Sequence, residues 1–420
     1  MVTAVATVSG PAVQSTRITP PRLPSLTGLR WVGAMLVFGF HVGTMHVIAD
    51  RDYASVLSWT FGLGLSGVQF FFILSGFVLV WSARPGDPVL SFWRRRFAKI
   101  YPSHLVMWAV VVGYLFYLGF QQNPKVLLAN LFLVQAWTPT QGYFYSVNTV
   151  SWSLSCEMFF YLCLPLVLPL IRRMRPWMLW AVIVAMPLLI LSLGPVQHLV
   201  PESDRWWFTQ VFPVARSLEF WLGVAAAELM LRGRWRGPGL ATASVIFLGT
   251  WVVASAHWIP AGYWTTVLSV VYLLVITAAA RADVRGTRSP WRARPMVWLG
   301  EVSFAFYLVH VFVVLTVLRE TGYPHGLPGW WGPLGAVGFL LLNLLLAWLM
   351  FRFVETPMVR LLKPARRAPA AARNPTVAAE ASPPGAVPAP VAVPRPRTGP
   401  AEDARDGSPG RVGELASDRG

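Results

Sequence analysis

The side chains best suited to chemistry in this chain are ionisable groups that lie inside long apolar stretches. An ionisable side chain at membrane depth is costly, so each one is a functional hypothesis. Imidazole and carboxylate groups there can transfer protons, and guanidinium groups can bind anions. The residues of this kind are His41, His46, Glu157, Arg216, Glu219, Glu228, Glu301 and His310.

Arg30 and His41 share the first apolar stretch. On an α-helix their spacing turns through about 1100°, which is roughly 20° beyond three full turns, and gives a rise of about 16.5 Å. The two side chains therefore lie on one face. We expect Arg30 at the cytoplasmic mouth, facing an anionic ligand, and His41 near mid-membrane, facing that ligand's far end. The alternative is an Arg that only sets topology and a His that only bonds to a neighbouring helix.

A basic cluster follows the second apolar stretch and consists of Arg94, Arg95, Arg96 and Lys99. Arg96 and Lys99 are three residues apart, so on a helical turn they face the same way. Topology alone explains most basic loops. Four cations within six residues exceed what the orientation of the protein in the membrane requires. They suit a polyphosphate ligand such as coenzyme A, because the guanidinium group of Arg binds two phosphate oxygens at once.

Glu157 lies about 7.5 Å inside the predicted outer end of its span. An unpaired carboxylate at that depth would be protonated or would need a partner. It could orient His41, accept a proton or bind sugar hydroxyls. The alternative is a hydrogen bond that only packs two helices together.

Two pairs of opposite charge favour structural roles. Arg216 and Glu219 are three residues apart on one span and can neutralise each other. Arg216 is nevertheless kept as a candidate contact for a bound ligand. Glu228 lies close to Arg232 and indicates a pair at the membrane interface.

Four further ionisable residues lie in or near the apolar stretches. We expect His46 near the outer interface and Glu301 near the inner one, both without a chemical role. His310 is deep enough either to support the binding site or to serve packing. Glu355 precedes Pro357, which predicts the end of the last helix.

Composition indicates the elements that must position these residues. Hydrophobic residues make up 55% of the 420 residues and charged ones 13%, against about 25% charged in a soluble domain. The sequence therefore predicts an all-α, polytopic transmembrane helical bundle of about ten spans. The candidate spans are 30–48, 64–81, 104–120, 152–170, 177–193, 211–231, 240–256, 264–280, 297–317 and 331–353. The short apolar stretch 125–134 is either a re-entrant or interfacial piece or an eleventh element.

The charges of the connecting loops predict the orientation. Alternate loops carry 16 Lys and Arg on one side and 4 on the other, and basic loops stay in the cytoplasm. Both termini are then cytoplasmic. The net charge of +17 follows from these loops, so we expect a lipid bilayer as partner and no nucleic acid.

The sequence divides into three parts. Residues 1–22 and 363–420 are rich in Pro, Ala and Gly, and we expect a disordered leader and a disordered cytoplasmic tail around a transmembrane domain at 23–362. No metal-ligand spacing, Walker loop or dinucleotide fingerprint is present. A secondary transporter with a proton relay of His, Glu and Arg is the rival hypothesis, since such residues also line transport paths.

Five motifs occur in order along the chain. They are Arg30-x10-His41, Phe-Phe-x-Leu-Ser-Gly-Phe at 71–77, Arg95-Arg96-x-x-Lys99-Ile-Tyr-Pro, Trp-Ser-Leu-Ser-x-Glu at 152–157, and Glu355-x-Pro357. Together they resemble the acyltransferase-3 family of integral membrane O-acyltransferases over residues 23–362. Each motif is weak alone, and their order and spacing carry the resemblance.

The resemblance implies ten or more spans, acyl-CoA as co-substrate with no bound cofactor, and a hydroxylated sugar or glycoside as acceptor. By position it implies a catalytic role for His41 and a site carboxylate at Glu157. It also implies donor contacts at Arg30, Arg95, Arg96 and Lys99. Lys99 stands where an Arg is common, which keeps the charge and loses the planar fork.

These implications give a mechanism. The phosphates of acyl-CoA bind Arg30 and the basic cluster, and the thioester reaches a neutral His41, which acts as general base or is itself acylated. No esterase-like domain follows the membrane part in this sequence, which favours a small acceptor such as a macrolide. The Ala, Arg and Pro content is typical of a high-GC bacterium, so we expect the bacterial inner membrane.

Overall fold

The computed structural model describes residues 21–83, 86–322 and 326–362. Within these residues the chain is helical, and the one strand-like feature is an isolated bridge between Ile48 and Leu327. The predicted all-α class is therefore confirmed. The proposed disordered ends fall almost entirely outside the described residues.

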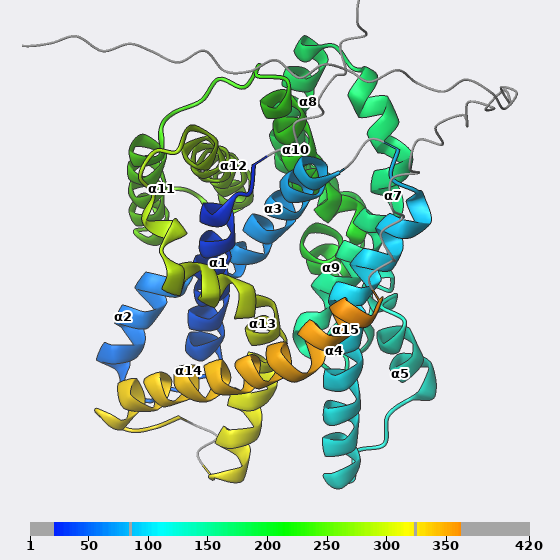
Figure 1. The fold of residues 1–420 in the computed structure, drawn as a ribbon. Coiled ribbons are helices and arrows are strands. Elements are labelled where there is room, and N and C mark those ends of the chain that lie inside the picture. The colour runs from blue at the N-terminus through cyan, green and yellow to red at the C-terminus, as the bar shows by residue number, and fades with distance from the viewer. Residues whose placement is uncertain (1–20, 84–85, 323–325, 363–420) are drawn as a thin grey trace, which may run out of the picture. The chain divides into compact units, whose positions relative to one another are not determined.

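A helix occupies each of the ten predicted spans (Figure 1). Eight helical stretches are long and apolar enough to cross a membrane, which confirms a polytopic helical bundle. The number of spans and the side on which the termini lie stay predictions. The ten helices are α1 Pro24–Thr44, α3 Gly67–Ser82, α4 Val89–Tyr117, α7 Trp152–Arg173, α8 Pro176–Val196, α10 Pro213–Leu231, α11 Leu240–Ser255, α12 Ala261–Arg285, α13 Arg294–Glu320 and α14 Trp331–Met350.

Helix α1 begins earlier than the hydrophobic pattern predicted. Pro24 stands in its first turn, where the fixed φ of proline suits a helix and the missing N–H costs nothing. Arg30 therefore lies six residues inside the helix, and His41 lies three residues before its end at Thr44. The structure places His41 in the last turn of α1, whereas the sequence predicted a position near the middle of the span.

Small residues let the central helices approach closely. A Cβ atom on Gly300 of α13 would lie 1.7 Å from the carbonyl oxygen of Thr27 in α1, and one on Gly223 of α10 would lie 2.0 Å from that of Ile73 in α3. Glycine at such positions allows backbones to touch. These contacts set the distance between α1 and α13 and between α3 and α10, which the functional site depends on.

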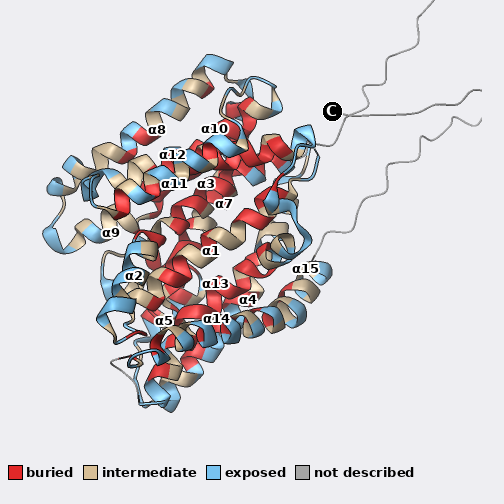
Figure 2. Cartoon of the chain, turned by 90° about the vertical axis from the view of Figure 1, so that its left-hand side faces the viewer, coloured by how far each residue is buried: buried red, intermediate tan, exposed pale blue. Residues whose placement is uncertain are grey.

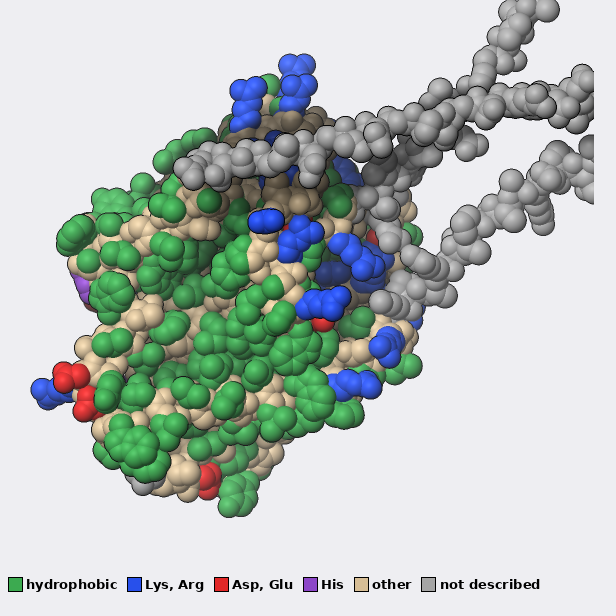
Figure 3. All heavy atoms as spheres, turned by 60° about the vertical axis from the view of Figure 1, so that its left-hand side comes forward, with side chains coloured by type: hydrophobic (Ala, Val, Ile, Leu, Met, Phe, Trp, Pro, Cys, Tyr) green, Lys and Arg blue, Asp and Glu red, His purple; other side chains and the backbone are tan. Residues whose placement is uncertain are grey.

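Burial divides the bundle into a centre and a periphery. Most residues of α10 are buried, and Figure 2 shows buried residues concentrated in the central helices. On α14, the side chains of Leu334, Val337, Leu341 and Leu345 are exposed at helical spacing. Figure 3 shows a broad hydrophobic area on one face with Lys and Arg gathered along its border. This distribution suits a protein surrounded by lipid.

Several short helices lie in stretches where no span was predicted, among them α2 and α5. Helix α2 covers Arg51–Phe61 with Tyr53, Val56 and Trp59 exposed, and α5 covers Pro124–Leu131. Eight residues of α-helix extend about 12 Å, which is too short to cross a bilayer of roughly 30 Å. The stretch 125–134 is therefore a short piece of a loop and adds no span.

The last span continues past its predicted end. A π-helical turn, Phe351–Glu355, leads directly into α15, Thr356–Leu362. Pro357 lacks the N–H that would bond to the carbonyl of Phe353, and a wider turn precedes it. The prediction that this proline stops the helix is wrong, because the backbone accommodates it with a π turn.

Candidate active site

A pocket opens between α1, α3, α4, α7 and α13, and we call it the cationic pocket. It has a volume of about 150 Å³. Its lining residues are Arg30, Val68, Phe71, Phe72, Leu74, Ser75, Val78, Leu79, Arg96, Lys99, Ile100, Ser153, Leu154, Glu157, Tyr161, Ser303, Phe304 and Tyr307. Four of the sequence-predicted site residues, Arg30, Arg96, Lys99 and Glu157, are thus brought together from three helices.

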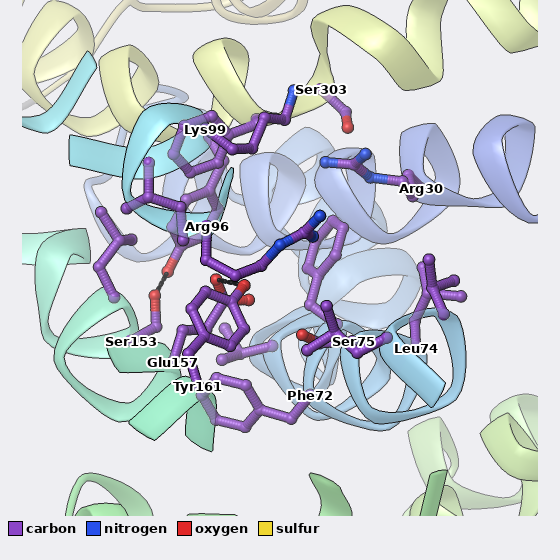
Figure 4. Close-up of a pocket in the computed structure, with 18 residues that line it drawn as sticks. Arg30, Phe72, Leu74, Ser75, Arg96, Lys99, Ser153, Glu157, Tyr161 and Ser303 are labelled. Carbon is purple, nitrogen blue, oxygen red and sulfur yellow. Dashed lines mark hydrogen bonds between the residues drawn. The ribbon is translucent and has the colours of Figure 1, made fainter. Parts of the chain in front are cut away.

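The electrostatics of the cationic pocket favour an anion. Figure 4 shows the guanidinium groups of Arg30 and Arg96 extending into the same space above Glu157. Among the described residues, neither guanidinium has a carboxylate within ion-pair distance. The carboxyl group of Glu157 can balance at most one of these two cations, so a lipid-embedded site requires a further counter-charge. Planar guanidinium groups match phosphate or carboxylate oxygens.

Glu157 is held by its neighbour one turn later on α7. The Tyr161 hydroxyl donates a hydrogen bond of 2.7 Å to its Oε2 atom. The indole N–H of Trp93 on α4 donates a bond of 2.9 Å to the carbonyl of Tyr161. This contact attaches α4 to α7 and so positions Arg96 opposite Glu157. Tyr161 was missed by the sequence analysis, although its spacing from Glu157 was a usable signal.

Lys99 is paired with Glu355, which arrives from the π-helical turn after α14. The Glu355 side chain is only 2% exposed. From the sequence, Glu355 was expected to belong to a helix terminator, and its contact with Lys99 of the pocket was not predicted. Among the described residues that line the pocket, Arg30 and Arg96 are then the cations that form no ion pair.

Arg95 and Arg216, two predicted ligand contacts, do not line the cationic pocket. Arg95 bonds to Asp87 and to the Ser91 hydroxyl at 2.7 Å, because successive residues on a helix point about 100° apart. Arg216 forms a buried pair with Glu219 at 3.0 Å. Their roles as donor contacts stay predictions, whereas the predicted charge pair of Arg216 is confirmed.

Arg216 reaches the cationic pocket only through an aromatic ring. Its guanidinium lies 5.6 Å from the ring centroid of Phe72, and Phe72 lines the pocket. The other predicted pair also forms, with Arg232 Nε donating to Glu228 at 2.9 Å. His46 and Glu301 are exposed.

His41 lies against His310, and we call these two residues the histidine pair. His310 Nε2 is 3.2 Å from His41 Nδ1. The same Nδ1 atom is 2.9 Å from the carbonyl oxygen of Val37, and His310 Nδ1 is 2.7 Å from that of Tyr307. A carbonyl only accepts, so each Nδ1 must carry the proton.

This arrangement assigns both tautomers from the hydrogen-bond network. His310 donates from Nδ1 to the carbonyl of Tyr307 and accepts at Nε2 from His41. His41 shares its Nδ1 proton between Val37 and His310. The lone pair of neutral His41 is consequently on Nε2, which is the atom available to take a proton or attack a carbonyl carbon.

Tyr307 separates the histidine pair from the cationic pocket. It lines the pocket, and its ring centroid lies 5.8 Å from that of His310 and 6.3 Å from that of Phe71. Its hydroxyl is 2.8 Å from the Ser153 hydroxyl. His41 itself does not line the pocket, and Tyr307 is the lining residue whose ring lies against His310.

Comparison with known proteins supports the chemistry that this geometry suggests. The family model described as an acyltransferase domain matches residues 23–352. The acyltransferase MdmB of Streptomyces mycarofaciens is 38% identical, over 84% of this chain and 96% of the relative. The exopolysaccharide production protein ExoZ of Rhizobium meliloti is 30% identical, over 71% and 91%.

A more distant relative is longer than this chain. The peptidoglycan O-acetyltransferase OatA of Listeria monocytogenes is 26% identical over 82% of this chain, which spans 57% of that protein. No solved structure shows a significant match. The chain belongs to this acyltransferase family, and it is a multi-pass membrane enzyme that transfers acyl groups.

Proposed function

We propose that the enzyme transfers an acetyl or other short acyl group from acyl-CoA to a hydroxyl of a carbohydrate or of a glycosylated small molecule such as a macrolide. The proposal is carried by the combination of two pocket arginines, which form no ion pair among the described residues, with a histidine whose Nε2 atom has the lone pair. Relatives named as an acyltransferase and as a peptidoglycan O-acetyltransferase support the carbohydrate-type acceptor.

The cationic pocket receives the anionic part of the donor. The pocket has a volume of about 150 Å³, and it receives one phosphate group or part of the flexible arm. Arg30 and Arg96 bind phosphate oxygens here. The rise of about 16.5 Å from Arg30 to His41 is comparable with an extended pantetheine arm, which brings the thioester past Tyr307.

His41 then acts as the general base. Its Nε2 atom takes the proton of the acceptor hydroxyl, whose oxygen forms the new bond to the acyl carbon while the carbon–sulfur bond breaks. The coenzyme A thiolate leaves and takes up the proton from His41 Nε2, which restores the neutral ring. His310 accepts from His41 Nδ1 throughout and stabilises the transient imidazolium.

Matched histidine variants test the proposal. We expect His41→Asn to lower acyl transfer from labelled acetyl-CoA by roughly 10²–10⁴-fold, the usual contribution of a general base. His46→Asn is the control, because His46 is exposed with φ of 52° and Asn tolerates that conformation. The acceptors are tylosin, a macrolide glycoside, and cellotetraose, a short glucan.

The outcomes distinguish an enzyme from a transporter, and a general-base role of His41 from a role as acyl carrier. Near-normal turnover in His41→Asn contradicts the assignment of the base. Labelled acyl groups that stay on the protein after denaturation, and that disappear in His41→Asn, identify an acyl-histidine instead. Uptake of acceptor without release of coenzyme A supports the rival hypothesis of a secondary transporter.

A further inference from the structure

A second and larger space lies at the other ends of the same helices, and we call it the distal cleft. It has a volume of about 860 Å³ and lies between α4, α13, the segment 147–149 and the residue that follows α1. Its polar lining residues include Tyr114, Asn148, Thr149, Thr316 and Arg319. None of these residues lines the cationic pocket.

The histidine pair lies between the two spaces along the helices. Helix α13 contributes Tyr307 to the cationic pocket and Val311 to the distal cleft, and His310 lies between them. Helix α1 contributes Arg30 to the pocket, and Met45, one turn beyond His41, lines the cleft. The distal cleft thus lies on the side of the histidine pair opposite Arg30, and the neighbours Met45 and Val311, rather than the histidines themselves, line it.

Asn148 connects the distal cleft to the helix that carries His310. Its side-chain amide donates a bond of 2.9 Å to the carbonyl of Leu308, which fixes the orientation of the amide. Asn148 is only 2% exposed, and its Oδ1 atom has no hydrogen-bond partner in the part of the chain that the structure describes. A buried acceptor of this kind is costly unless a donor reaches it, and a ligand hydroxyl is such a donor after a small side-chain shift.

The remaining lining describes the rest of the ligand. Apolar and aromatic side chains from α4 and α13, among them Leu115, Phe312 and Leu315, form an apolar wall, and Arg319 lies 5.7 Å from the ring centroid of Phe120. Hydroxyls of Thr149 and Thr316 are interspersed. A mainly apolar wall with few polar groups fits an amphiphilic ligand, whereas a polysaccharide strand would need more hydrogen-bonding partners.

We propose that the distal cleft is the acceptor site and that it binds a lipophilic glycoside, with an apolar aglycone on the wall and a hydroxyl presented toward His41. This inference rests on the proposed acyl transfer. The large volume suits a macrocyclic molecule. The donor and the acceptor thereby enter from opposite ends of the bundle and meet at the histidine pair.

Filling the cleft tests the site through kinetics. We expect Thr316→Trp to raise the KM for tylosin at least tenfold and to leave the KM for acetyl-CoA unchanged. Leu248→Trp is the control, because Leu248 of α11 is 60% exposed and lies outside both spaces. An unchanged KM for tylosin in Thr316→Trp, or transfer to cellotetraose with none to tylosin, overturns the inference.

Chemical protection tests the site without turnover. In purified protein with Cys163→Ser, the remaining Cys156 is fully buried, so a cysteine placed at Thr149 can be followed with N-ethylmaleimide. We expect tylosin to slow labelling of Thr149→Cys at least fivefold and to leave the exposed control Ser203→Cys unaffected. Equal labelling with and without tylosin contradicts the site.

The two experiments also separate this inference from the proposed function. If wild-type protein transfers acyl groups to neither acceptor while tylosin still protects Thr149→Cys, the proposed function fails and the binding site stands. If transfer to tylosin proceeds without protection and without an effect of Thr316→Trp, the function stands and the distal cleft is not the acceptor site.

Discussion

Neighbouring residues on one helix have different surroundings in this enzyme. Arg96 lines the cationic pocket with Arg30, whereas Arg95 is engaged by Asp87 and Ser91. His41 depends on a partner far away in the sequence, since His310 accepts from its Nδ1 atom. At the residue scale, chemical role therefore follows from what each side chain contacts.

The two arginines provide a direct comparison. A hydrogen bond to a charged group contributes about 1.5–3 kcal/mol, so Arg96→Gln should raise the KM for acetyl-CoA by roughly 10–100-fold. Arg95→Gln should change it less than threefold, because its guanidinium bonds outside the pocket. Steady-state kinetics on both variants check this, and equal increases would refute the assigned surroundings.

His310 is a positioning residue, because it acts through His41. Replacing the group that orients a functional imidazole typically costs about 10–100-fold. We expect His310→Leu to lower kcat by that order and to leave the KM for acetyl-CoA unchanged. His310→Gln, whose amide oxygen can accept from His41 Nδ1, should recover part of the loss. A purely structural role would lower both variants equally and reduce the amount of folded protein.

Among the helices, α10 supports the cationic pocket from behind by packing against α3. Most of its residues are buried, and its ion pair between Arg216 and Glu219 lies behind Phe72, a lining residue of the cationic pocket. Its close contact with α3 depends on Gly223 and Gly76. The shape of the pocket thus depends on a helix that contributes no side chain to it.

Gly223→Leu tests this dependence. The new side chain has no space beside the carbonyl of Ile73, and overpacking of this kind typically costs about 1–3 kcal/mol. We expect a lower Tm and weaker acetyl-CoA binding. Gly249→Leu is the control, because a Cβ atom on Gly249 of α11 meets no atom of the described residues within 4 Å. Equal Tm values for the two variants would show that α3 and α10 can separate without cost.

At the scale of the whole molecule, the basic loops and the two spaces are arranged along the direction of the long helices. The loops with 16 Lys and Arg lie at the helix ends nearest the cationic pocket, and the distal cleft lies at the opposite ends. A donor made in the cytoplasm would then meet the cationic side first. The orientation predicted from the loops and the proposed order of the two sites agree.

Cysteine accessibility in intact cells checks this orientation. In a Cys163→Ser background, Ser203→Cys should react with a membrane-impermeant maleimide added outside the cell. Thr287→Cys, which is also exposed, should react only after the membrane is permeabilised. The reverse pattern would invert the topology and place the cationic pocket on the outer side.

The sequence by itself determined the class of fold and the positions of the long helices, because hydrophobic length and 3.6-residue periodicity are local properties. It also placed Arg30 and His41 on one helix, and it indicated that Arg96 and Lys99 face together. It did not predict the early start of α1 or the π turn before Pro357, since both depend on backbone adjustments at prolines.

Only the tertiary structure decided which helix faces meet. His41 and His310 are 269 residues apart, and Lys99 and Glu355 are 256 apart. Periodicity fixes the angle between side chains on one helix, whereas the rotation of that helix against its neighbours depends on packing and close glycine contacts. For this reason the sequence identified both histidines as candidates and could not show that His310 accepts a hydrogen bond from His41.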